Sequence, residues 1–516
     1  MSPKAISRVP VVIVGAGPTG ITAATLLAQY AVDSLVLDRW PSVYQQPRAV
    51  HLDDEIYRII ARLGIADEFA AISRPTLGLR LLDNGFRVLA EFTRDTSRSR
   101  NGFPQANMFD QPELEAVLRA NLKRYPRAEL RGHAEVTDVT DTGEYIRVTF
   151  TDRTDGTVHQ VDSDYLLGCD GANSLVRTQI GSAIRDLNFN QRWLVVDVAT
   201  DADLGQWEGV HQVCDPARAG TYMRIGTSRY RWEFELLSGE CADDFASVTA
   251  LRPLIRPWTA DVEDRDLTLL RVAEYTFRAQ IAQNWRRGNV FLLGDAAHLT
   301  PPFIGQGMGA GVRDAMNLAW KIAGVQHGAL APAVLDSYEQ ERKPHTRSLI
   351  RLALNVGRAM TGGARVGNAL RRAVLPRLRL LPGLRDKVVD STTPALASSA
   401  LVCRARGRLG GTLCPNPRLR DGRRLDDVLG TGFALITTRK LGPADEAALR
   451  RRGFVVLVAR PGDALTRWLR DGRATAAVIR PDRTVARAGR DVSTLCAWAT
   501  GVVEGPFDRD ATSVAR

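Results

Sequence analysis

In the first part of the chain, apolar and polar positions follow the periods of buried strands and helices. The run Val11–Val14 is followed by a helical pattern over residues 21–29 and by a second apolar run, Ser34–Leu37. Short apolar runs bounded by turn residues are typical of strands buried on both faces of a parallel sheet. This order predicts a β-α-β unit at the start of the chain.

Glycines join the first predicted strand to the helix in the pattern G-x-G-x-x-G, at Gly15, Gly17 and Gly20. In a dinucleotide site, the first glycine allows a tight turn, the second lets the backbone approach a pyrophosphate, and the third lets the helix pack against the strand. The helix N-terminus offers N–H groups to the phosphates, and Asp38 can accept hydrogen bonds from a ribose. The pattern predicts a dinucleotide site, and the alternative is an ordinary strand-to-helix turn.

Two later apolar runs, residues 158–167 and 289–293, also end in glycine and aspartate. The first continues into Gly168-Cys169-Asp170-Gly171, and the second into Gly294-Asp295. Because ligands of open α/β sheets lie beyond the carboxyl ends of strands, we expect the three strand ends to converge on one long cofactor. Asp295 can accept from a ribityl or ribose hydroxyl, and Gly307 to Gly309 offer backbone N–H groups to a ring carbonyl.

The remaining segments have other patterns. Short alternating runs in residues 75–100 and 188–275 predict a mostly antiparallel sheet. After residue 402, strand-like runs alternate with helical patterns and predict a small α/β unit. We therefore predict an α/β protein made of a Rossmann-like domain (1–74, 101–187 and 276–360), an inserted, mostly antiparallel β-sheet domain (75–100 and 188–275), a linker (361–401) and a C-terminal domain (402–516).

The charge of the chain raises one further function. A formal net charge of +11 suggests nucleic-acid binding. Much of the excess lies in the arginine-rich stretch 364–386, however, and no nucleic-acid motif accompanies it. A solvated helix face is the simpler interpretation, and attraction of anionic substrates or pyridine nucleotide is the alternative.

The cysteines and the apolar runs narrow the setting. The six cysteines form neither C-x-x-C nor a zinc spacing. No apolar run reaches the ~20 residues of a membrane helix, and the first strand begins too early for a signal peptide to precede it. We expect a cytoplasmic protein that binds no metal, membrane or nucleic acid, and the sequence leaves a homodimer open.

The three glycine–aspartate segments together resemble the class A flavoprotein aromatic hydroxylases, whose best-known member acts on para-hydroxybenzoate. The resemblance covers residues 9–360. Within this class the chain looks most similar to the 3-(3-hydroxyphenyl)propionate hydroxylases, and the segments that carry this likeness are Pro47–Glu55, Trp193–Asp197, Cys214–Pro216, Arg231–Phe234 and Arg480–Arg483.

The resemblance implies FAD as the cofactor, with its pyrophosphate on the first glycine motif, its adenosine ribose at Asp38 and its ribityl chain at Asp295. It also implies that Asp170 lies near FAD and a visiting nicotinamide cofactor. The cofactor residues implied in this way are Gly15, Gly17, Pro18, Thr19, Gly20, Asp38, Arg39, Arg48, Gln111, Asp170, Gly294, Asp295, Pro302, Gly305, Gly307, Met308 and Gly309.

The C-terminal unit resembles the thioredoxin-like domain of the phenol hydroxylase branch. It lacks C-x-x-C, and Cys403 and Cys414 are not spaced for redox work. We therefore expect this unit to act in packing or assembly.

The implied activity is hydroxylation of a phenolic aromatic acid such as 3-(3-hydroxyphenyl)propionate. NADH or NADPH reduces FAD, O₂ then forms a flavin hydroperoxide, and the substrate ring attacks its distal oxygen. Because only one G-x-G-x-x-G is present, we expect the nicotinamide cofactor to bind transiently. The candidate substrate contacts are His51, His211, Tyr222 and Arg224, on segments expected to face the flavin ring.

Two other functions stay open. One is a tailoring hydroxylase or Baeyer–Villiger oxygenase of a polycyclic aromatic natural product. The other is a flavin-binding protein without oxygenase turnover. NAD(P)H oxidation with and without a phenol separates an enzyme from a binding protein.

Overall fold

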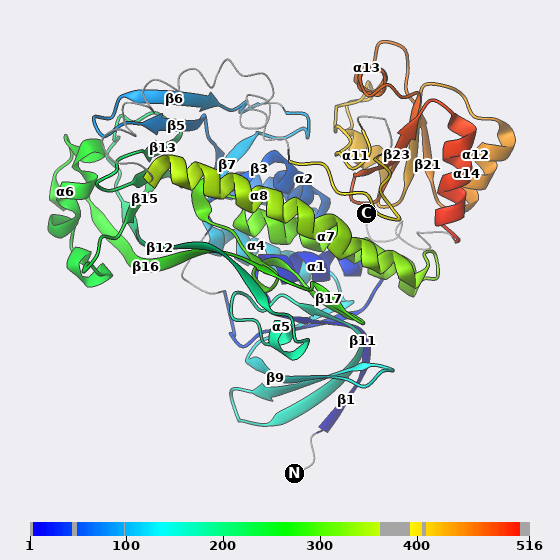
Figure 1. The fold of residues 1–516 in the computed structure, drawn as a ribbon, viewed down its shortest axis with the longest axis horizontal. Coiled ribbons are helices and arrows are strands. Elements are labelled where there is room, and N and C mark those ends of the chain that lie inside the picture. Colours follow the sequence, from blue (N-terminus) through cyan, green and yellow to red (C-terminus); the bar gives the residue numbers. More distant parts are fainter. Residues whose placement is uncertain (1–3, 44–48, 98, 362–392, 405–408, 506–516) are drawn as a thin grey trace.

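The computed structural model describes residues 4–43, 49–97, 99–361, 393–404 and 409–505. The fold is mixed α/β with several sheets (Figure 1). The N-terminal sheet has the order β17-β18-β11-β1-β2-β8, and β10 and β9 extend it from β11. Its strands are β1 (Lys4–Val14), β2 (Ser34–Leu37), β8 (Ala128–Arg131), β9 (Ala134–Asp141), β10 (Ile146–Asp152), β11 (Val158–Gly168), β17 (Arg286–Arg287) and β18 (Val290–Leu292).

Strands β18, β11, β1, β2 and β8 run parallel to one another. Val11, Val12 and Ile13 are fully buried, as their continuous apolar pattern predicts for a central parallel strand. Helix α1 (Pro18–Gln29) completes the predicted β-α-β unit, and it contacts both α4 (Gln111–Leu122) and α7 (Gly307–Gln326). Helix α7 is buried from Gly309 to Gly324. The long helix α8 (Ser337–Thr361) packs against it (Figure 1).

The second sheet has the order β19-β16-β12-β15-β14-β13-β5-β6 and is antiparallel except where β13 pairs with β5. Its strands β12 and β16 extend past residues 188 and 275, where the sequence pattern placed the domain boundaries. The bounds are β5 (Gly78–Leu82), β6 (Val88–Thr93), β12 (Ile184–Ala199), β13 (Val210–Val213), β14 (Gly220–Arg224), β15 (Arg229–Glu235), β16 (Thr268–Ala282) and β19 (His298–Leu299).

Helix α6 (Val248–Thr259) packs on one face of this sheet, which we call the outer face. The strand-rich pattern of residues 188–275 did not predict this helix, which contains two prolines. Leu251, Ile255 and Trp258 are buried at helical spacing and join Trp232 of β15 in one core. This apolar stripe holds the helix in place despite the prolines, which cost hydrogen bonds inside a helix.

A small third sheet holds a further candidate residue. It pairs β3 (His51–Asp53) with β7 (Ala106–Phe109), which also pairs with β4 (Ser73–Pro75). Asp53 ends β3 and caps helix α2 (Asp54–Arg62) by accepting from the backbone N–H of Ile56 at 2.9 Å. Helix α3 (Ala66–Ile72) follows.

The C-terminal unit contains the sheet β21-β20-β22-β23, in which β20 and β21 are parallel and the other pairs antiparallel (Figure 1). One face of this sheet belongs to the main core, where the rings of Phe433 and Trp320 lie 5.4 Å apart edge to face. The elements are α11 (Leu425–Leu429), β20 (Ala434–Thr437), α12 (Pro443–Arg451), β21 (Val455–Val458), α13 (Ala464–Asp471), β22 (Ala476–Ile479), β23 (Val485–Gly489) and α14 (Val492–Val502).

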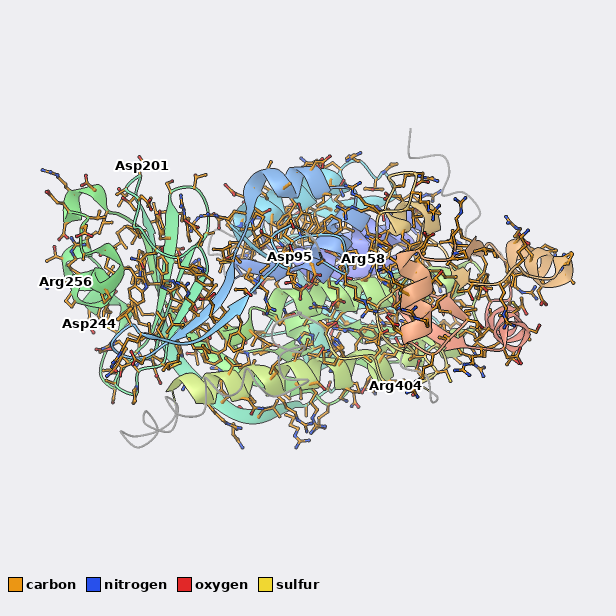
Figure 2. The ribbon with its side chains drawn as sticks, turned by 90° about the horizontal axis from the view of Figure 1, so that it is seen from above. Arg58, Asp95, Asp201, Asp244, Arg256 and Arg404 are labelled. Atoms are coloured by element: carbon orange, nitrogen blue, oxygen red, sulfur yellow. The ribbon has the colours of Figure 1, made fainter. Side chains whose placement is uncertain are left out.

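Buried ion pairs also join this unit to the rest of the chain. Arg58 of α2 lies where the N-terminal helices meet the C-terminal unit (Figure 2), and it pairs with Asp426 at 2.6 Å. Arg480 pairs with Glu341 of α8 at 2.8 Å, and both side chains are fully buried. The C-terminal unit is thus an integral part of the packed structure.

Candidate cofactor and substrate site

The three glycine–aspartate segments meet at one edge of the N-terminal sheet. Val14 is the register partner of Gly168, which is also the partner of Leu292, so β1, β11 and β18 end side by side. The backbone N–H of Cys169 donates to the carbonyl of Val14 at 2.8 Å, and that of Leu293 donates to the carbonyl of Gly168 at 2.9 Å. The structure therefore brings the three motifs together, as the pattern predicted.

The first motif is shaped by close backbone contacts. Gly15 has a φ of +103°, and a Cβ there would lie 2.3 Å from the carbonyl oxygen of Cys169. A Cβ at Gly20 would lie 2.0 Å from the carbonyl oxygen of Gly15. Gly17, in contrast, has no atom within 4 Å of its Cβ position and lies at the N-cap of α1, which has no side-chain cap. The open face of Gly17 and the uncapped helix N-terminus fit a pyrophosphate.

Asp38 lies beside this loop. Its Oδ2 accepts from the backbone N–H of Ala16 at 2.6 Å, and its Oδ1 accepts from that of Trp40 at 2.7 Å. The carboxylate is thereby fixed at the end of β2, where a ribose hydroxyl would be recognised. Arg39 is exposed, with its guanidinium 5.6 Å from the centre of the Trp40 ring.

The first and third motifs are packed together through Thr19. A Cβ at Gly294 would lie 2.9 Å from the Thr19 hydroxyl oxygen, and one at Gly311 would lie 2.2 Å from it. Asp314 of α7 accepts from the backbone N–H of Gly294 at 3.1 Å and pairs with His298 at 2.8 Å. His298 is thus a structural residue of its motif, and half-buried Asp295 lies in a short 3₁₀ turn, three residues after the end of β18.

The second motif is tied to the third as well. Asp170 accepts from the backbone N–H of Val176 at 3.0 Å, and burial raises the pKa of its carboxyl. Arg177 donates to the backbone carbonyls of Ala172 and Ala296 at 2.8 and 2.9 Å. These bonds fix the second loop against the residue that follows Asp295.

The loop from Pro302 to Gly309, which we call the ring loop, lies against His51. Gly305 has a φ of +62°, and a Cβ there would lie 2.7 Å from Nδ1 of His51. Gln306 donates to Asp53 at 2.9 Å, whereas the nearest atom to a Cβ at Gly307 is 3.9 Å away. Burial lowers the pKa of His51 to about 4, so its imidazole is neutral at neutral pH.

Another predicted cofactor residue, Gln111, lies on the first turn of α4. Gln111 accepts from the backbone N–H of Ala49 at 2.7 Å and donates to Glu115 at 2.7 Å. These bonds place it directly beside the segment that precedes β3. Arg48 lies outside the described residues.

The structure does not bring the other predicted substrate residues to the ring loop. His211 and Tyr222 lie on the outer face of the second sheet, in the core beneath α6, where His211 accepts from the Trp258 indole N–H at 3.1 Å. Arg224 pairs with Glu208 at 2.8 Å. The side chains of His211 and Tyr222 therefore point away from the ring loop, although the sequence led us to expect their segments to face the flavin ring.

The opposite, inner face of the second sheet contacts the ring loop instead. Gln212, next to His211, donates to the backbone carbonyl of Phe303 at 3.0 Å, and Trp193 packs edge to face on the Phe303 ring. Strand side chains alternate between faces, so neighbours of outer-face residues point toward this loop.

Sequence reasoning assigned no role to a charged cluster on the inner face. Fully buried Asp197 accepts from Arg231 at 2.6 and 2.9 Å and from Arg229 at 2.8 Å. Arg229 also pairs with Asp110 at the start of α4. Burial raises the pKa of the nearby Glu233 carboxyl. The alternation Arg231-Trp232-Glu233-Phe234 was the available signal, because it places two charges on one face and two aromatic rings on the other.

The chain is similar to known hydroxylases along most of its length. The chain is 34% identical to the "3-(3-hydroxy-phenyl)propionate/3-hydroxycinnamic acid hydroxylase" of Burkholderia cenocepacia (strain HI2424), over 93% of this chain and 94% of that one. It is 31% identical to the "Probable NADH-specific resorcinol 4-hydroxylase" of Rhodococcus jostii (strain RHA1), over 96% and 94% of the two chains.

Solved structures share the fold. The flavin-dependent monooxygenase PieE, in complex with FAD and substrate, matches with a TM-score of 0.79 and 24% identity, over 98% of this chain and 100% of that one. Aklavinone-11 hydroxylase, with FAD and aklavinone, matches with a TM-score of 0.76 and 24% identity, over 96% and 99% of the chains.

These likenesses define the class of protein as an FAD-dependent aromatic monooxygenase. A family model described as "FAD binding domain" matches residues 8–353, and the chain belongs to that family of class A flavin monooxygenases. Among the described residues, no helix could span a membrane and no cluster of His, Cys, Asp and Glu could hold a metal ion.

Proposed function

We propose that this protein hydroxylates a phenolic aromatic acid such as 3-(3-hydroxyphenyl)propionate, with NADH or NADPH as reductant and O₂ as co-substrate. The observation that carries the proposal is the convergence of three motifs on one sheet edge in a chain that matches hydroxylases along almost its whole length. The relatives' names supply the substrate class, a phenol with an acidic side chain.

The residues present fit FAD. Gly17 and the N-terminus of α1 would hold the pyrophosphate, Asp38 the adenosine ribose and Asp295 the ribityl chain, while the ring loop would flank the ring. Bound FAD would supply hydride acceptance from the nicotinamide and activation of O₂. We also propose that Asp170 lies next to the site where NADH or NADPH binds transiently.

The chain itself must orient the phenol and exclude water. We propose that the substrate ring lies between the ring loop and the inner face of the second sheet, where Gln212 and Trp193 contact Phe303. The imidazole of His51, which burial keeps neutral at neutral pH, would accept a hydrogen bond from the phenol hydroxyl and so orient the ring. Holding the ring close to the oxygen donor supplies the reacting geometry.

His211 provides a matched control for this role. Burial lowers the pKa of both imidazoles to about 4, but only His51 lies against the ring loop. The experiment measures NADH and NADPH oxidation, and incorporation of labelled oxygen into product, over a panel of phenolic acids. We expect His51→Gln to lower kcat by roughly 10²-fold while FAD stays bound, because the phenol loses its orientation, and His211→Gln to retain turnover. Equal losses in both variants would exclude this role for His51.

A tailoring hydroxylase or Baeyer–Villiger oxygenase of a polycyclic aromatic compound is the second candidate. The observation in its favour is that the similar solved structures include aklavinone-11 hydroxylase, although at 24% identity that likeness shows the fold alone. Stimulation of NAD(P)H oxidation by polycyclic phenols, and by none of the phenolic acids, would favour it.

We propose that the C-terminal unit is thioredoxin-like and has a packing role. Its β-α-β-α-β-β-α order from β20 to α14, with a parallel pair followed by antiparallel strands, supports this assignment. All six cysteines are free, and burial raises the pKa of Cys414 to about 12, which keeps its thiol protonated and unreactive. The predicted domain boundaries remain part of this proposal, with the second sheet extended to residues 184 and 282.

A further inference from the structure

A cavity of about 540 Å³ lies away from the three strand ends, between α2 and the C-terminal unit. We call it the α2 cavity. Its walls include Arg58 and Arg62 of α2, Arg100, and Asp426 and Arg483 of the C-terminal unit. A volume of this size is typical of a small-molecule site. The ring loop and the inner face of the second sheet do not line it, so the proposed hydroxylation does not account for it.

One wall of the α2 cavity has more guanidinium groups than carboxylates. Arg58 donates to both oxygens of Asp426 at 2.6 and 2.7 Å, and Arg483 pairs with the same carboxylate at 2.9 Å. Two buried cations therefore share one anion. Nη1 of Arg483, whose side chain is 4% exposed, has no hydrogen-bond partner among the described residues.

Two further arginines of the wall lie next to neutral groups. Arg62 donates to the amide oxygen of Gln29, and its guanidinium is 5.5 Å from the centre of the Tyr30 ring. Arg100 is exposed at the rim and donates to the backbone carbonyl of Leu413 at 2.9 Å. Neither cation forms an ion pair among the described residues.

The acids elsewhere on the walls do not balance this excess. Glu55, at 2.9 Å, shares the guanidinium of Arg313 with Asp53, and Asp482 pairs with Arg480. Asp54 accepts from the side chain of Asn101 at 3.1 Å, and burial beside Asp53 raises its pKa to about 7. The walls thus hold six guanidinium groups, those of Arg58, Arg62, Arg100, Arg313, Arg342 and Arg483, against the four carboxyl groups of Asp54, Glu55, Asp426 and Asp482.

We propose that the α2 cavity binds a small oxyanion, through carboxylate or phosphate groups held by Arg62, Arg100 and Arg483. Guanidinium groups match the planar, bidentate geometry of these anions, and a buried cation with an unused donor is stabilised when an acceptor arrives. The exposed rim at Arg100 gives such a solute a way in from solvent. The site goes beyond the proposed function, because it requires neither flavin chemistry nor an aromatic substrate.

Binding is tested by isothermal titration of the full chain saturated with FAD, which fills the other phosphate site. The two probes are inorganic phosphate and citrate, titrated at constant ionic strength with chloride as the reference salt. The probe that binds more tightly shows whether the α2 cavity prefers phosphate or carboxylate groups. We expect one-to-one, saturable binding of at least one of the two.

Two variants distinguish binding in the α2 cavity from non-specific attraction of anions to a positively charged protein. Arg100→Gln removes a rim cation that makes only a backbone hydrogen bond, so the fold should persist. Arg127→Gln is the matched control, because Arg127 carries the same charge on the surface beside Asp33. We expect Arg100→Gln to weaken binding roughly 10-fold or more, as the loss of a charge-assisted hydrogen bond implies, and Arg127→Gln to leave it unchanged.

Arg62→Gln is a second, independent test, because Arg62 lies on α2 and Arg100 does not. We expect this variant to weaken binding as well. The proposal fails if neither probe binds saturably at about 10 mM, a concentration at which even a millimolar site is filled. It also fails if Arg100→Gln and Arg62→Gln bind as tightly as the wild type, or if Arg127→Gln weakens binding equally.

Discussion

Replacing Glu341 by glutamine should destabilise the whole protein, because this carboxylate anchors the C-terminal unit. Glu341 is fully buried on α8 and accepts from Arg480 at 2.8 and 3.0 Å and from Lys321 at 2.9 Å. Burial alone would raise the pKa of Glu341, but Arg480 and Lys321 overcome this effect and hold the pKa below its usual range. The group is therefore an anion at any pH at which the protein is handled.

The magnitude follows from what the substitution leaves behind. In Glu341→Gln, Arg480 keeps its ion pair with Asp482, and Lys321 keeps no ion pair among the described residues. Removing one partner of a buried ion pair costs about 3–5 kcal/mol, since an uncompensated charge remains in the interior. The matched control is Glu446→Gln, which breaks the exposed pair with Arg450 and should cost less than about 1 kcal/mol.

Urea unfolding of the FAD-loaded protein measures both variants, followed by protein fluorescence and by release of the flavin. We expect Glu341→Gln to lower the free energy of unfolding several times more than Glu446→Gln. By the same reasoning, a chain that lacks residues 402–516 should not remain folded, because Glu341 and Arg58 would both lose buried partners. The reasoning is refuted if Glu341→Gln unfolds at the same urea concentration as Glu446→Gln.

Other predictions concern stability and cofactor binding. Burial raises the pKa of Asp54 from 3.8 to about 7. Between these two pH values the folded protein keeps a proton that the unfolded chain has released. The free energy of unfolding therefore falls as pH rises from about 4 to about 7. Asp54→Asn should therefore stabilise the protein at pH 8 by up to roughly 4 kcal/mol and have little effect at pH 4, and a gain independent of pH would contradict this. Gly17→Ala should fold normally but bind FAD weakly, because its Cβ would occupy only the open phosphate face, whereas Gly15→Ala should misfold against the Cys169 carbonyl. Melting temperature and flavin content of the two purified variants test this contrast, and equal melting temperatures would count against it.

The parts of the fold that the sequence predicted have a strong local signal. The β-α-β unit and the strand ends at Gly168 and Gly294 could be predicted because a continuous apolar run and a glycine turn lie next to each other in the chain. Helix α6 was missed because Pro253 and Pro257 interrupt its pattern. The third sheet was missed because strands of three or four residues are too short to show alternation.

The site was predictable only where its residues are contiguous. Alternation shows that His211 and Gln212 point to opposite faces of a strand, but it does not show which face meets the cofactor. Both faces of the second sheet carry tryptophan, Trp232 on the outer side and Trp193 on the inner side. Tertiary packing alone distinguishes them, so the sequence could not show on which face of the sheet the His211 side chain lies.

Buried charges connect the ring loop to the wall of the α2 cavity. Asp53 accepts from Gln306 of the ring loop at 2.9 Å, and it pairs with Arg313 of α7. Arg313 also pairs with Glu55, and both Arg313 and Glu55 line the α2 cavity. Because these three charged groups are largely shielded from water, their mutual attraction is stronger than that of surface pairs. The carboxylates at the N-terminus of α2 are thus held by one arginine of α7, and this buried cluster ties the ring loop to the cavity wall.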